Sequence, residues 1–116
     1  MRLSGSDSGS TSALFASLKG WIEQEGARGC LFFRVHAETG GKTPEIETAV
    51  AAYHVRLHAL IADLVAHETG VADDELTDQI LALFEGATTA ATYRGTAVID
   101  AAGACAGRLI AARTPR

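Results

Sequence analysis

The stretch TPEIETAVAAYHVRLHALIADLVAHETG, residues 43–70, decides the fold class of this chain. Thr43 is placed to cap a helix, Pro44 suits its first position, and the glutamates of the first turn complement the positive end of the helix dipole. Beyond this start, apolar residues recur every three or four positions until Gly70, which is typical of an α-helix. They are Ile46, Val50, Tyr53, Leu57, Leu60 and Leu64. At about 1.5 Å per residue this helix is nearly 40 Å long, and since alanine rather than charge fills its other faces, we expect neighbours on several sides.

Four further helices are predicted on either side of this stretch. Helical spacing, capping residues and terminal glycines place them at about 12–25, 29–39, 74–94 and 96–112. The one apolar run that could be a strand, residues 30–35, falls inside the predicted helix 29–39. The sequence therefore predicts an all-α domain of five helices.

The size and charge of the chain exclude several classes of protein. It has 116 residues, enough for one domain, and a formal net charge of −4 from 10 basic and 14 acidic residues. Nucleic-acid-binding domains usually show a basic surplus, so we expect no nucleic acid contact by this chain. Residues 1–11 are rich in Ser and Gly and are expected to be flexible, which leaves residues 12–113 as the folded domain.

Targeting signals and cysteine usage favour the cytoplasm. Arg2 is not followed by an apolar run, so no signal peptide is expected. No stretch approaches about 18 uncharged apolar residues, so we expect no membrane span. Cys30 and Cys105 are far apart and form no CxxC motif, which favours a reducing compartment.

Histidine and acidic residues do not form a catalytic or metal-binding pattern. His54 and His58 are four residues apart on the long helix, but the zinc-protease signature needs a glutamate where Val55 stands. His36 and Glu38 are two residues apart, so they lie on different faces of a helix and cannot converge on one reacting atom. We interpret these histidines as solvated or at the edge of the core, and predict no metal.

Two other motifs also do not indicate a catalytic or nucleotide-binding site. Cys30 stands at a predicted helix start but has no histidine near it in sequence, so a structural role is favoured over a nucleophile. Residues 40–43 read GGKT, but a phosphate-binding loop needs an upstream strand and an earlier glycine where Ala37 stands. We therefore predict neither an enzyme nor a bound cofactor.

Aromatic residues on several predicted helices have two interpretations. They could line a small-molecule pocket, because such pockets combine apolar walls with a few polar groups. The alternative is that they fill the core. The aromatic residues are Trp21, Phe33, Tyr53 and Phe84, and the polar ones are His36, Thr88, Thr89 and Thr92.

A set of short motifs resembles the C-terminal domain of TetR-family transcriptional regulators. The segment Arg28-Gly29-Cys30-Leu31-Phe32 carries most of the resemblance, and the long helix that begins with proline follows it. Gly-Val-Ala-Asp at 70–73 and Phe-Glu-Gly-Ala at 84–87 complete the pattern. The resemblance covers about residues 14–113. It implies an all-helical domain that encloses a small-molecule inducer and dimerises through its last two helices.

Small residues on the last two predicted helices agree with this implication. Gly86, Ala90, Gly103 and Gly107 would let a partner helix approach closely, and Gly in a helix interior otherwise costs up to about 1 kcal/mol. Members of the family also carry an N-terminal helix-turn-helix that reads DNA. That element has no counterpart in this sequence, so DNA contact is carried over to no residue.

We therefore expect a ligand-sensing and homodimerisation domain of a TetR-like regulator, without its own DNA-reading domain. The alternative is a standalone helical interaction protein that heterodimerises with a full-length relative and antagonises it. The expected ligand is small and lipophilic, and its contacts are Trp21, Phe33, His36, Tyr53, Leu57, Phe84 and Thr88. The expected dimer interface consists of Leu83, Gly86, Ala90, Val98, Ala102, Cys105 and Leu109.

Overall fold

The computed structural model of the chain describes residues 10–25 and 44–115. Over these residues it contains four α-helices and no strand, which confirms the predicted all-α class. The helices are α1 (Thr11–Glu25), α3 (Pro44–Thr69), α4 (Asp74–Arg94) and α5 (Ala97–Arg113). The predicted helix 29–39 and residues 1–9 of the predicted flexible segment 1–11 lie outside the described residues, and Thr11 of that segment is the first residue of α1.

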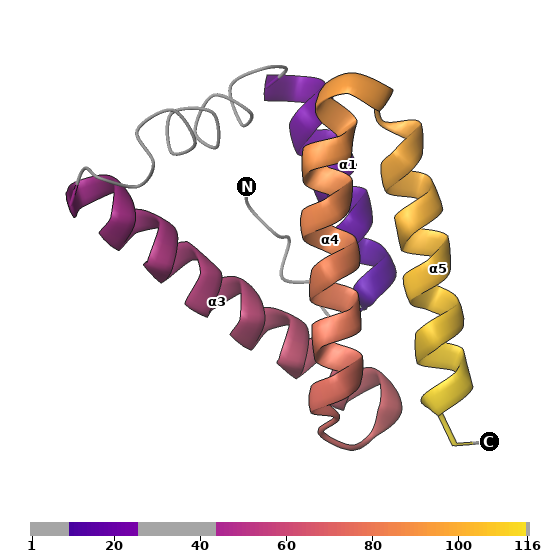
Figure 1. Ribbon diagram of the computed structural model, residues 1–116. Coiled ribbons are helices and arrows are strands. Elements are labelled where there is room, and N and C mark those ends of the chain that lie inside the picture. Colours follow the sequence, from indigo (N-terminus) through magenta and orange to yellow (C-terminus); the bar gives the residue numbers. More distant parts are fainter. Residues whose placement is uncertain (1–9, 26–43, 116) are drawn as a thin grey trace.

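Three of the helices form a bundle, and the fourth, α3, packs against it at one end and diverges from it (Figure 1). α4 and α5 run antiparallel and side by side, and α1 packs mainly against α5. α3 meets α4 along the C-terminal part of its length, while its N-terminal end lies away from the other three helices. The core therefore forms where α1, α4 and α5 meet the second half of α3.

The core is organised around Phe15 of α1. Its ring meets the ring of Phe84 on α4 edge to face, with centroids 5.7 Å apart and an interplanar angle of 67°. A Cβ atom on Gly103 of α5 would lie only 3.2 Å from the Cβ of Phe15. Gly103 thus makes room for α1 of the same chain, which corrects the expectation that this glycine admits a partner helix.

Polar contacts hold α1 at its N-terminus and near its middle. Ser10 caps the helix by accepting a hydrogen bond from the Ala13 amide at 3.0 Å, one of the capping interactions that the sequence suggested. Thr11 binds the carboxylate of Glu68 near the end of α3. Lys19 forms an ion pair of 3.0 Å with Asp100 at the start of α5. The last two contacts connect α1 to α3 and to α5.

The two halves of α3 have different surroundings. Its C-terminal half contributes Leu57, Ile61, Leu64 and Val65 to the core, each at most 4 % exposed. In the other half Val55 is 70 % exposed, and Ala49 and Ala51 are exposed as well. The expectation of neighbours on several sides is therefore wrong for this half, because alanine-rich faces signal low charge and not necessarily contact.

Length and composition alone would allow α3 to cross a membrane. Among the described residues it is the one helix that is long and apolar enough. Its mean hydropathy is 1.3 over 18 residues, of which 28 % are buried inside the structure. Two charged residues of this helix, Arg56 and Asp63, interrupt its apolar run, which is why it contains no stretch of about 18 uncharged apolar residues.

The turn between α3 and α4 is tied to the end of α5. Gly70 ends α3 with φ at 83°, a conformation that favours glycine. Asp73 caps α4 by accepting a hydrogen bond from the Leu76 amide at 3.0 Å, as the sequence predicted. Arg113, in the last turn of α5, donates to Asp73 and to Glu75. One arginine thus links the C-terminal end of α5 to the first turn of α4.

We expect a leucine to have opposite effects at two glycines. Gly103→Leu should lower the free energy of unfolding by about 1–3 kcal/mol, because Phe15 must move to admit the side chain. Gly20→Leu should raise it by up to about 1 kcal/mol, because Gly20 is exposed, its Cβ would meet nothing within 4 Å, and leucine favours a helix. Urea denaturation measures both. Equal effects at the two sites would contradict the close approach of α1 and α5.

The free energy of unfolding should decrease at acidic pH because the Asp73 carboxylate becomes protonated. The Leu76 amide and the Arg113 guanidinium lower the pKa of this carboxyl from its ordinary value of 3.8. The folded state therefore gains stability from the ionised form above that value, and loses it as the pH falls through the lowered pKa. Asp73→Ala should melt at a lower temperature at pH 7 and should lose less stability between about pH 5 and 2. Asp63→Asn, on an exposed part of α3, should keep the acid dependence of the wild type.

Candidate functional site

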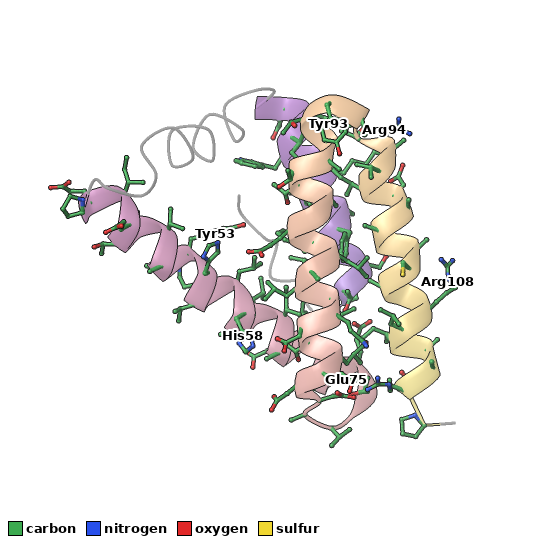
Figure 2. All side chains as sticks on the ribbon, viewed as in Figure 1. Tyr53, His58, Glu75, Tyr93, Arg94 and Arg108 are labelled. Carbon is green, nitrogen blue, oxygen red and sulfur yellow. The ribbon has the colours of Figure 1, made fainter. Side chains whose placement is uncertain are left out.

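A small polar pocket lies between α3 and α4. Its volume is about 160 Å³, and neighbouring residues of α3 form one wall while residues one turn apart on α4 form the other. Figure 2 shows Tyr53 near the middle of α3. The lining residues are Tyr53, His54, Glu85, Thr88 and Thr89.

Two histidine–carboxylate pairs connect α3 to α4. The Nε2 atom of His54 lies 3.4 Å from Oε1 of Glu85, and the Nε2 atom of His58 lies 3.9 Å from Oδ1 of Asp78. All four side chains are between 45 and 73 % exposed, in line with the prediction of histidines at the edge of the core. Each histidine therefore faces an acid of α4.

Over residues 10–25 and 44–115 no group of three or more His, Cys, Asp or Glu could hold a metal ion.

The surroundings of Tyr53 in this pocket shift its pKa. Burial raises the pKa of its phenol above the ordinary value of 10.0, and the negative charge of Glu85 raises it further. Its ring lies 5.6 Å from the ring of His54, measured between centroids, at an angle of 55°. The pocket therefore holds a neutral phenol beside an imidazole and a carboxylate.

The predicted ligand contacts are only partly brought together. Tyr53 and Thr88 share the pocket, and the Thr88 hydroxyl donates to the Phe84 carbonyl at 2.9 Å. Leu57 and Phe84 are core residues, and Trp21 packs against the core while partly exposed. The predicted contacts Phe33 and His36, like Cys30, lie outside the described residues.

The structure adds His54 and Glu85 to the pocket, and it places Thr89, one of the polar candidates from the sequence, in the same lining. Glu85, Thr88 and Thr89 are spaced so that they share one face of α4. This spacing was visible in the sequence. The sequence did not show that His54 of α3 faces them.

A second and larger hollow runs between α4 and α5. It is an open groove of about 350 Å³ that no charged side chain lines. Five of the seven predicted interface residues line it; Ala90 and Leu109 lie on the same helices outside its lining. The lining residues are Ala82, Leu83, Gly86, Ala87, Val98, Ala101, Ala102 and Cys105.

The groove lies on the side of α5 that faces away from α1. Gly103 faces Phe15 of α1, whereas Val98, Ala101 and Cys105 lie near the opposite side of the helix, at 100° per residue. On α4, Gly86 is exposed, and a Cβ there would meet nothing within 4 Å. Small side chains therefore leave this apolar surface open to an approaching helix.

Comparisons with known proteins return no match for this chain, whether with family models, curated proteins or solved structures. The TetR-family resemblance therefore stays a prediction, and function has to be argued from the pocket and the groove.

The buried phenol of Tyr53 should make stability depend on pH in the alkaline range. Because its folded pKa is raised, the stabilisation is complete below about pH 10 and is lost as the pH rises through the folded pKa. In Tyr53→Phe the free energy of unfolding should therefore decline less steeply between about pH 9 and 11 than in the wild type. Tyr93→Phe is the control, because Tyr93 is 76 % exposed on the same protein. Identical pH curves for wild type and Tyr53→Phe would contradict this environment.

Proposed function

We propose that this chain is a small-molecule-sensing and homodimerisation domain, similar to the C-terminal domain of TetR-like transcriptional regulators, and that it acts in the cytoplasm. The observation that carries the proposal is the open apolar groove between α4 and α5. Contiguous apolar surface exposed to water usually marks an interaction site. The proposal assigns no DNA contact to any residue of this acidic chain.

A second copy of the chain is the occupant that suits the groove. In a dimer with two-fold symmetry the same surface is used twice, so an α4–α5 pair would pack on the partner's α4–α5 pair. Gly86 and Ala101 lie on adjacent helices and are both exposed, so two such pairs could approach closely. Interfaces of obligate homodimers are apolar and often bury more than about 2,000 Å². The uncharged lining of the groove is consistent with such an interface.

The sensing role rests on α4, which the pocket and the groove share. Glu85, Thr88 and Thr89 point to the pocket side of this helix, while Leu83 and Gly86 line the groove. A ligand that prefers one position of α4 against α3 would therefore also favour one arrangement of the dimer. In a longer regulator this arrangement would set the spacing of two DNA-reading domains.

The dimer is tested by filling the groove from one position. Gly86→Arg should convert a dimer into a monomer, because the new side chain occupies the groove and brings a charge into an apolar interface. The folded monomer tolerates the substitution, since a Cβ at Gly86 meets nothing within 4 Å. Sedimentation velocity over a range of protein concentrations measures the change.

Gly20→Arg is the matched control. Gly20 is also an exposed helical glycine with an open Cβ position, but it lies on α1 away from the groove. It should leave the dimer intact. A Gly86→Arg protein that still dimerises would place the interface elsewhere. A monomeric wild type would contradict self-association and favour the alternative in which a full-length relative covers the groove.

A further inference from the structure

The pocket between α3 and α4 presents an uneven set of charges. Its lining contains one carboxylate, that of Glu85, and neither lysine nor arginine. The imidazole of His54 is the one basic group in the lining, and it lies against one oxygen of the carboxylate, Oε1, at 3.4 Å. No lysine or arginine of the lining balances the negative charge of Glu85.

The hydroxyl groups of the pocket add acceptors to this carboxylate. Thr88 lines the pocket and donates its hydroxyl hydrogen to the Phe84 carbonyl, so its oxygen can act toward a ligand only as an acceptor. Thr89 stands next to it and is exposed. The aromatic ring of Tyr53 completes the opposite wall, and the electron-rich face of such a ring attracts cations. These groups together favour a ligand that is positively charged and donates hydrogen bonds.

The volume limits the size of that ligand. A cavity of about 150 Å³ accommodates one benzene molecule, and this pocket has about 160 Å³. A single ring with a short charged group therefore fits, with the charged group at Glu85 and part of the ring extending toward solvent.

We propose that the α3–α4 pocket binds a small organic cation, an ammonium or amidinium group on a body about the size of one aromatic ring. This inference rests on the proposed sensing function and assigns a ligand class to the same site. It differs from the lipophilic ligand that the sequence suggested. Two apolar residues predicted as ligand contacts, Leu57 and Phe84, are buried in the core and do not line this pocket.

The proposal is tested with three probes of nearly the same shape: benzylammonium, benzyl alcohol and benzoate. Each is titrated into the ¹⁵N-labelled full chain at pH 7, and the amide shifts of the lining residues are followed by NMR. Benzylammonium should shift these amides and bind about tenfold more tightly than benzyl alcohol, because only the cation forms a charge-assisted hydrogen bond with Glu85. Benzoate should not bind, because its charge repeats that of Glu85.

Two substitutions on α4 separate ligand contact from helix packing. Glu85→Gln keeps the size of the side chain, removes its charge, and should weaken benzylammonium binding about tenfold. Asp78→Asn is the matched control, since it also removes an acid that pairs with a histidine of α3 but lies outside the pocket lining. Asp78→Asn should bind benzylammonium as the wild type does.

Three results would overturn the cation proposal: equal binding of benzyl alcohol, tighter binding of benzoate, or no shift with benzylammonium. Equal weakening by Glu85→Gln and Asp78→Asn would also overturn it, because helix packing would then explain the loss. Sedimentation of the same samples keeps the outcomes apart. A dimer without cation binding refutes the ligand class alone, whereas a monomer that binds benzylammonium refutes the dimer alone.

Discussion

The contact of Phe15 with Gly103 and Phe84 is the constraint on which the arrangement of the helices depends. α1 can lie this close to α5 only because Gly103 has no side chain at the crossing point. The ring of Phe15 then reaches α4 and meets Phe84 edge to face. One side chain therefore joins three helices, and Phe84, at the α4 end of this contact, is completely buried. Because this contact uses one side of α5, the opposite side remains open as the apolar groove.

α4 is the element that gives the fold its potential for function. Successive faces of this helix turn to the core at Phe84, to the polar pocket at Glu85 and to the groove at Gly86. A rigid helix transmits a displacement on one face to the others, since its backbone hydrogen bonds keep their spacing. The N-terminal half of α3, which forms the other wall of the pocket, has few buried side chains. This half is therefore the part of the described structure that can most easily adjust its position against α4.

The pairs between α3 and α4 explain why chemistry read from one helix is incomplete. In the sequence His54 and His58 stand four residues apart and suggest a site of their own. In the structure each faces a carboxylate of α4, and Glu85 makes His54 part of a polar pocket. Spacing within a helix shows which side chains share a face. It does not show which side chains of another helix face them, because that depends on how the two helices cross.

The sequence by itself predicted the four described helices, with limits within one residue of the observed ones, and most of their buried faces. Pro44, Gly70, Asp73 and Gly95 act on the backbone within one turn of themselves, so their effects are local and can be read along the chain. The five-helix count, which includes residues outside the described ranges, stays a prediction. Tertiary structure alone decided that Gly103 receives α1, that half of α3 is left exposed, and that Tyr53 and Thr88 join Glu85 instead of Trp21. Each of these outcomes depends on packing between helices far apart in the sequence, where several partners can cover the same apolar face at similar cost.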